Sequence, residues 1–230
     1  MLRIAIQQSD YIPWKGYFDI IRSVDMFVLY DDVQFTRRDW RNRNRIKTSS
    51  GLLWLTIPVK VKEKYKQLIR EVEVADSRWA KKHWKTICYN YSGTRYFEEY
   101  KRCFEDAYKE AGEMKMLTDI NIHFLNLINS LLGIKTLIKR VEEYSSEGRR
   151  SDRILSLCRA SGATEYLTGP SGMNYLNHEK FTSQGVKILI ADYSNYRDYT
   201  QPWPPFVHFV SIIDLLFCTG KNAVSYMKKT

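Results

Sequence analysis

Residues 3–32, RIAIQQSDYIPWKGYFDIIRSVDMFVLYDD, predict a strand, a helix and a second strand in close succession. RIAIQQ (3–8) has the apolar content of a short strand, and the turn after it contains a proline and a glycine, which interrupt regular structure. DIIRSV (19–24) predicts a short helix, and MFVLYDDV (26–33) predicts a strand that ends on two carboxylates. Elements in this order are typical of α/β folds with a largely parallel sheet.

The rest of the chain continues the alternation of strands and helices. Between 78 and 132 the spacing of apolar residues becomes helical, as in NIHFLNLINSLLG. We therefore expect one domain over 1–230, with a largely parallel twisted sheet flanked by helices and a helical insertion or subdomain around 78–132. Further strands are expected at 52–59, 136–142, 164–169 and 186–193, a helix ends near Gly162, and the last helix covers about 206–218.

Charge and composition indicate the kind of partner. Lys and Arg outnumber Asp and Glu by 36 to 26, which gives a net charge of +10, and 14% of the residues are aromatic. A surplus of cations predicts anionic partners such as phosphates, nucleotides, nucleic acid or acidic lipids.

Two further features predict the compartment. The longest near-apolar run, VHFVSIIDLLFC (207–218), is too short to span a bilayer, and MLRIAIQQ has no signal-peptide layout. Four cysteines occur without a CxxC pair, so we expect free, reduced, buried thiols. The expectation is a soluble cytoplasmic protein without a membrane span.

Ligands of open α/β sheets gather beyond the carboxyl ends of the strands, and three groups of polar residues are expected there. A glycine in such a turn lets the backbone approach a ligand, although an ordinary turn explains it equally well. The candidates are Gln7, Gln8, Asp10, Tyr11, Trp14, Gly16 and Tyr17 after the first strand, Asp31 and Asp32 after the second, and Ser171 in GPSG (169–172).

Three side chains are candidates for a catalytic base. Asp31 and Asp32 are adjacent, so on an extended chain they point to opposite faces and do not share a proton. One of them could accept a proton from an amine or hold a cation, while Asp32 could instead cap a turn or pair with a neighbouring arginine, Arg37 or Arg38. His83, among lysines and beside Trp84, is the third candidate because a neutral imidazole can act as a base near pH 7.

DWRNRNRIK (39–47) alternates Arg and Asn in a way that neither a core nor an ordinary surface needs. Arg presents a planar fork of donors that suits phosphate, and Asn can bind a sugar hydroxyl. If the chain is extended here, the arginines line one face and the asparagines the other. Ligand contacts are therefore predicted for Trp40, Asn42, Arg43, Asn44 and Arg45, and a solvated loop is the alternative.

No familiar metal or nucleophile motif is present. The sequence lacks HExxH, Cys/His ligand spacing, a Walker loop and GxSxG. We therefore expect no zinc or iron site, whereas Mg²⁺ held by Asp31 or Asp32 together with ATP or a nucleotide diphosphate stays open.

Several stretches together resemble the WbqC-like family. They are IAIQQSDYIPWKGYFDII, DMFVLYDDVQFTRRDWRNRNRIK and GLLWLTIPV in the first half, and ILSLCRASGATEYLTGPSGMNYL and FVHFVSIIDLLFCTG in the second. The combination of Pro-x-x-Gly-Tyr-Phe, Tyr-Asp-Asp and Trp-x-Asn-Arg-Asn is specific, and the similarity covers nearly the whole chain. The family usually has Gln-Pro where this chain has Gln7-Gln8.

The resemblance implies a role in building bacterial surface polysaccharides such as O-antigen. It implies transfer of an aminoacyl group, for example glycyl, to the amine of a nucleotide-linked amino-deoxy sugar, with aminoacyl-tRNA or ATP plus an amino acid as the donor. Two other functions remain open. The basic, aromatic chain could bind RNA or tRNA without catalysis. It could also be a nucleotidyltransferase-like enzyme that activates an acid with ATP, although the place of that class's histidines holds only Tyr11 to Tyr17.

Overall fold

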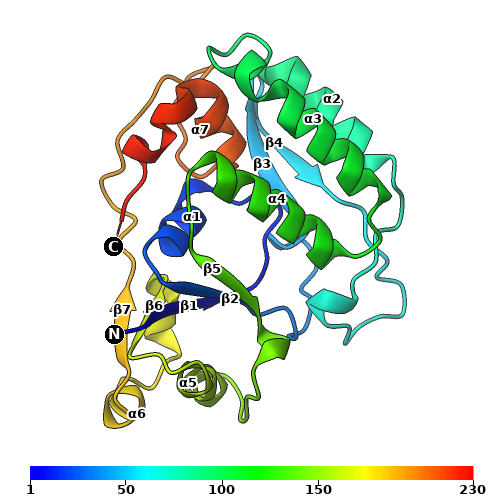
Figure 1. Cartoon of the computed structure of the whole chain (residues 1–230). Helices are drawn as coiled ribbons and strands as arrows, with labels where there is room; N and C mark the ends of the chain where they lie inside the picture. Colours follow the sequence, from blue (N-terminus) through cyan, green and yellow to red (C-terminus); the bar gives the residue numbers. More distant parts are fainter. Residues whose placement is uncertain (230) are drawn as a thin grey trace.

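A computed structural model describes residues 1–229, and its centre is a five-stranded sheet in which all neighbouring strands are parallel. The order β5-β2-β1-β6-β7 places the first strand of the chain in the middle (Figure 1). The predicted α/β class with a largely parallel sheet is confirmed. The strands are β1 (Arg3–Gln7), β2 (Met26–Leu29), β5 (Leu137–Arg140), β6 (Glu165–Thr168) and β7 (Lys187–Ile190).

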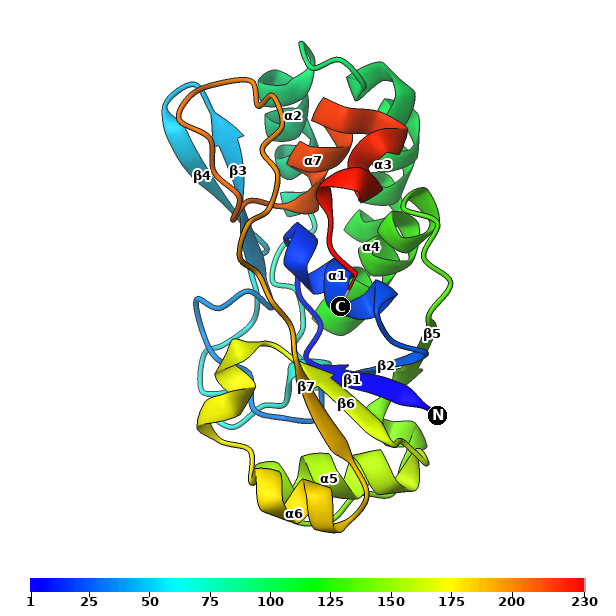
Figure 2. The ribbon, with the colours of Figure 1, turned by 90° about the vertical axis from the view of Figure 1, so that its left-hand side faces the viewer.

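Helices cover both faces of this sheet, as Figure 2 shows. Side chains alternate along β1, so Ile4 and Ile6 pack with the layer of α5 and α6 while Ala5 faces the opposite layer. The opposite layer begins with α1 and continues into the larger group of helices. The helices are α1 (Lys15–Arg22), α2 (Trp79–Tyr91), α3 (Phe97–Glu113), α4 (Leu117–Leu131), α5 (Ser151–Ala160), α6 (His178–Ser183) and α7 (Ile212–Thr219).

Three helices, α2, α3 and α4, occupy the range 78–132 that the sequence predicted to be helical. They do not form an isolated group, since α3 also contacts α7 from the end of the chain. Phe217 of α7 packs against Phe97 and Phe104 of α3, with ring centroids 5.2 and 5.4 Å apart. The helical layer therefore joins residues from distant parts of the sequence.

The strand predicted at 52–59 is present, and it lies outside the main parallel sheet. β4 (Gly51–Thr56) pairs antiparallel with β3 (Arg43–Thr48), and the two strands form a separate hairpin beside α2. β3 lacks the usual strand pattern because its buried face carries the polar Asn44 beside the apolar Ile46. The solvated-loop alternative for DWRNRNRIK is wrong for residues 43–47, which belong to the strand β3, whereas residues 39–42 form a turn.

Two helices begin at places that the sequence did not predict. α1 begins at Lys15 instead of residue 19, because Pro13 and Trp14 precede its first turn and Gly16 leaves room for the folded-back Trp14 ring. A Cβ at Gly16 would lie 2.3 Å from that ring. α7 begins at Ile212 instead of residue 206, where the Ser211 side chain caps it.

The expected burial of all four cysteines holds only for Cys158. All four thiols are free, and Cys88, Cys103 and Cys218 are partly exposed. Within residues 1–229, no helix combines the length and the apolar character that crossing a bilayer requires.

Candidate functional site

A cavity of about 570 Å³ lies at the carboxyl ends of β1 and β6. These adjacent strands are the point at which the sheet changes direction, since β1 leads through α1 to β2 on one side and β6 leads through α6 to β7 on the other. Such a switch point is where open parallel sheets bind ligands. The cavity is lined by Ile6, Gln7, Gln8, Asp10, Tyr17, Tyr30, Arg41, Arg150, Ile154, Thr168, Gly169, Pro170, Ser171, Tyr175 and Tyr193.

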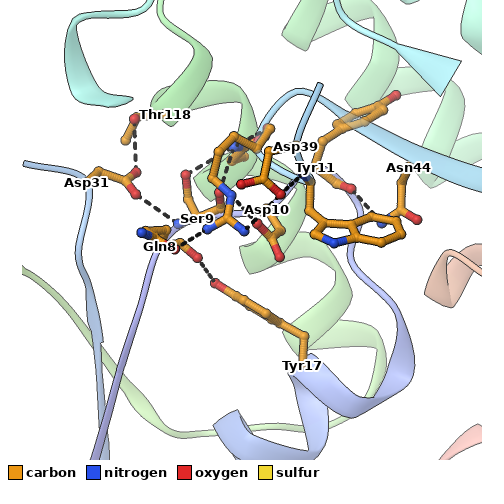
Figure 3. A network of polar contacts seen from close by, with 12 residues as sticks. Gln8, Ser9, Asp10, Tyr11, Tyr17, Asp31, Asp39, Asn44 and Thr118 are labelled. Carbon is orange, nitrogen blue, oxygen red and sulfur yellow. Dashed lines mark hydrogen bonds and ion pairs between the residues drawn. The ribbon is translucent and has the colours of Figure 1, made fainter. Parts of the chain in front are cut away.

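Asp10 and Arg41 form the charged centre of this cavity. Figure 3 shows Asp10 within the polar network that follows β1. Nε of Arg41 lies 2.8 Å from Oδ1 of Asp10, and its Nη1 donates to Oε1 of Gln8 at 2.5 Å. A second carboxylate, that of Asp39, lies 3.9 Å from the same guanidinium. These contacts hold the Arg41 guanidinium beside the loop that follows β1.

The environment of Asp10 changes its protonation. Burial raises the pKa of Asp10 from 3.8 to about 7, although the Arg41 guanidinium opposes the shift. The side chain still keeps 14% of its surface exposed, so it can reach a ligand. A carboxyl group that exchanges its proton near neutral pH is suited to general acid–base chemistry.

Asp31 holds the loop that carries Asp10. It is 3% exposed and accepts hydrogen bonds from the backbone N–H of Ser9 at 2.8 Å and from Oγ1 of Thr118 at 2.9 Å (Figure 3). Burial raises its pKa despite these donors. Asn121 of α4 adds a hydrogen bond to the carbonyl of Arg41 at 2.9 Å. Asp31 is thus a buried anchor behind the cavity and does not line it.

A family model described as the WbqC-like protein family matches residues 8–226, nearly the whole chain. The chain belongs to the WbqC-like protein family. This WbqC-like protein is 44% identical over 228 residues to an uncharacterized protein of Mycobacterium tuberculosis, Rv1507c, and the match covers 99% of this chain and 98% of the relative. No solved structure gives a significant match. Membership is consistent with a role in polysaccharide biosynthesis.

Asp32 of the WbqC-like protein has a different partner from those considered from sequence. It pairs with Arg153 of α5 and with neither Arg37 nor Arg38. Arg153 also lies 5.1 Å from the ring centroid of Tyr30, which lines the cavity. Asp32 therefore lies behind the cavity wall and connects β2 to α5.

We expect Asp32→Asn to act on stability more than on turnover. The change leaves the partly buried Arg153 guanidinium without its anion, which costs about 1–3 kcal/mol in the free energy of unfolding. Turnover should change much less than the roughly 10²-fold loss that removal of a base produces. Urea unfolding and steady-state kinetics measure the two effects, and the reverse pattern would return Asp32 to the catalytic step.

His83 and Tyr11 lie together in the helical layer. The Tyr11 hydroxyl lies 2.9 Å from Nδ1 of His83 and 2.8 Å from the Tyr108 hydroxyl. Tyr11 is fully buried, and burial lowers the pKa of His83 to about 4, so its imidazole is neutral at pH 7. His83 borders a different hollow, beside Trp79 and the lysines of α2, and neither residue lines the cavity that contains Asp10.

The other residues that were predicted around the loop after β1 either line the cavity or pack against residues that line it. Gln7, Tyr17 and Ser171 line the cavity, and the Tyr17 hydroxyl also donates to the carbonyl of Gln8 at 2.9 Å. Trp14 does not line it but packs against Tyr193, which does, with ring centroids 5.0 Å apart.

The Arg/Asn stretch separates into three parts. Arg41 enters the cavity, whereas Arg43 and Arg45 lie on one face of β3 with Trp54 opposite Arg45 on β4. Asn42 and Asn44 are buried on the other face, where their amides donate to backbone carbonyls. Trp40 is 38% exposed and lies beside Trp54. Of the residues at positions 40–45, only Arg41 lines the cavity.

Asp10 was one of the polar residues expected after the first strand, and Arg41 lies within the Arg/Asn stretch, but neither was predicted to be central to the site. One signal was available for Asp10, since it follows β1 just as Asp31 and Asp32 follow β2. The distant members had no such signal, because their places depend on folding. These are Arg150 and Tyr175, whereas Tyr30, Thr168 and Tyr193 lie at or near the ends of predicted strands and were not considered.

Over the part of the chain that the structure describes, 1–229, no three His, Cys, Asp or Glu side chains come together as a metal site would require. Mg²⁺ accompanying a diphosphate takes only one or two carboxylates from the protein. Asp31 and Asp32, the carboxylates considered for Mg²⁺ from the sequence, do not line the cavity, whereas Asp10 does. Binding of Mg²⁺ with a nucleotide stays a prediction.

Proposed function

We propose that this WbqC-like protein transfers an aminoacyl group, for example glycyl, to the amine of a nucleotide-linked amino-deoxy sugar in the biosynthesis of a surface polysaccharide. The observation that carries the proposal is Asp10, a carboxyl group with a pKa of about 7 at the switch-point cavity. An ammonium group must lose a proton before it can attack a carbonyl, and Asp10 is the group in the cavity suited to take it.

The cavity has the chemistry to hold such an acceptor. Arg150 and the hydroxyl of Ser171 supply donors for a diphosphate, and Gln7 can bind a sugar hydroxyl. Tyr30 and Tyr175 offer ring faces for a nucleobase. Arg41 faces Asp10 and holds the carboxylate in place while a proton moves.

The proposed transfer begins and ends with Asp10 ionised. Asp10 accepts a proton from the sugar ammonium, and the free amine attacks the carbonyl carbon of an activated aminoacyl donor. A C–N bond forms, and the bond between that carbon and the leaving oxygen breaks. Asp10 gives its proton to the leaving oxygen, and the nitrogen releases its second surplus proton to water. A neutral amide forms, the carboxylate is regenerated, and no oxidant or reductant is required.

Mass spectrometry of nucleotide-linked amino sugars tests the proposal. The protein is incubated with each sugar and with two donor mixtures, one of ATP plus amino acids and one of aminoacyl-tRNA. We expect one acceptor to gain the mass of one aminoacyl residue with one of the mixtures. The matched nucleotide sugar with a hydroxyl in place of the amine is the control and should stay unchanged. Absence of product from every amino sugar that binds the protein would refute the transfer.

A further inference from the structure

We propose that Trp40, Arg43, Arg45 and Trp54, here called the Trp/Arg face, bind single-stranded RNA. The idea that such an RNA carries the aminoacyl donor to Asp10 rests on the proposed function. The binding itself is independent of any catalysis. None of the four residues lines the cavity described above.

Two exposed rings form the centre of the Trp/Arg face. Trp40 is 38% exposed and Trp54 is 39% exposed, and their ring centroids lie 5.3 Å apart with the planes tilted by 39°. Trp residues are normally largely buried, so two that are exposed side by side indicate a binding surface. Unpaired bases stack on such rings whatever their sequence, because every base has a π-face.

Two arginines complete the face with positive charge. The guanidinium of Arg43 lies 4.1 Å from the Trp54 ring centroid, and that of Arg45 lies 5.4 Å from Trp54 and 5.5 Å from Trp40. Each donates to one backbone carbonyl, of Arg38 and Phe209 respectively. Within residues 1–229 no carboxylate pairs with either guanidinium, and both Nε atoms lack a hydrogen-bond partner. Two uncompensated cations beside stacking rings are complementary to a strand of bases linked by phosphates.

The charge favours RNA over a second copy of this chain as the occupant. A two-fold contact through the Trp/Arg face would bring Arg43 and Arg45 against the same arginines of the other copy. Like charges that meet in an interface are unfavourable, and the net charge of +10 adds to the repulsion. A polyanion gains from the same charges.

The face is joined to the cavity through the backbone. Trp40 directly precedes Arg41, and its carbonyl accepts the N–H of Tyr11, the residue after Asp10, at 3.1 Å. The Trp/Arg face and Asp10 therefore belong to one hydrogen-bonded unit. A strand that stacks on Trp40 therefore contacts the residue that directly precedes Arg41 in the sequence.

Fluorescence anisotropy with a labelled 12-nucleotide RNA of mixed sequence tests the inference at 50 mM salt. Trp54→Ala should weaken binding about tenfold, within the range of about 5- to 150-fold that one lost stacking partner produces. Trp54→Phe keeps a smaller ring and should give an intermediate loss. The double variant Arg43→Gln/Arg45→Gln should flatten the dependence of log K on log salt by about 1.4, since each phosphate contact to a single strand contributes about 0.7.

Matched variants on other surfaces make the test specific. Tyr89→Ala removes an aromatic side chain that is 85% exposed on α2, and Arg102→Gln removes an exposed cation on α3; both should bind RNA normally. DNA of the same sequence that binds equally well would still support stacking as the mode of recognition. Undetectable RNA binding, binding that Trp54→Ala leaves unchanged, or a dimer that depends on Trp54 in place of RNA binding would each overturn the inference. Asp10→Asn should bind RNA normally, so failure of the transferase proposal is distinguishable.

Discussion

Asp10→Asn is expected to lower turnover by about 10²-fold or more, because Asn keeps the size of the side chain but cannot accept the proton of the acceptor amine. The matched control is Asp39→Asn, which removes the other carboxylate near Arg41, 3.9 Å from its guanidinium, and leaves the base in place. Turnover of the control should stay close to that of the unaltered protein. Equal losses in the two variants would show that Arg41 needs a counter-charge and that Asp10 is not the base.

The pH dependence of turnover follows from the same residue. Since the base must be ionised, turnover should fall about tenfold per pH unit below the pKa of Asp10, about 7, and level off above it. Asp10→Asn should abolish this decline of turnover at low pH.

The stability of the protein should also depend on the protonation of Asp10. The folded-state pKa of Asp10 lies above the ordinary value of 3.8, so Asp10 contributes most to stability at low pH, and the contribution is lost as the pH rises to about 7. Removal of its charge should therefore not lower the melting temperature at pH 8.

Asn44→Ala is expected to lower the free energy of unfolding by about 2–4 kcal/mol, because it removes three hydrogen bonds from a buried side chain. The amide of Asn44 donates to the carbonyls of Tyr11 and Ile12 at 3.1 and 3.0 Å, and its oxygen accepts the N–H of Arg45 at 2.8 Å. The residue itself is 2% exposed. Urea unfolding monitored by Trp fluorescence measures the loss.

Asn42→Ala is the control for this change. Asn42 is also buried, but its amide makes one hydrogen bond, to the carbonyl of Ile57, so the expected loss is about 1 kcal/mol. If Asn44→Ala unfolds like the unaltered protein but no longer binds the nucleotide sugar, Asn44 contacts the ligand as the sequence first indicated.

The sequence predicted the central sheet because its strands are runs of apolar side chains. β1 and β2 are buried on both faces, so their residues need no alternation with polar ones, and turn residues mark their ends. β3 had no such signal. Its buried face is completed by the Asn44 amide, which is stable there only because the carbonyls of the first loop come within hydrogen-bond distance.

From the sequence, the residues of the candidate site could be predicted only where they lie in a segment that follows an expected strand. Gln7, Tyr17 and Ser171 were found because the carboxyl ends of parallel strands meet at one edge of a sheet. The roles of Asp10 and Asp31 could not be separated by sequence, since both are aspartates that follow a strand. The difference lies in Ser9 and Thr118, whose donors occupy the Asp31 carboxylate, and in Arg41, which faces Asp10.

The central place of β1 has a consequence for how the protein is made. β1 leaves the ribosome before the other strands of its sheet, yet its neighbour β6 joins it across a sequence distance such as the 162 positions between Leu2 and Thr164. At about 5–20 residues per second, translation needs on the order of ten seconds or more to supply that partner. Throughout this interval one edge of β1 is unpaired and can template pairing with other nascent chains. The half of the cavity formed by Gln7 and Asp10 is therefore synthesised well before the half formed by Thr168 and Ser171, and the cavity is complete only late in translation.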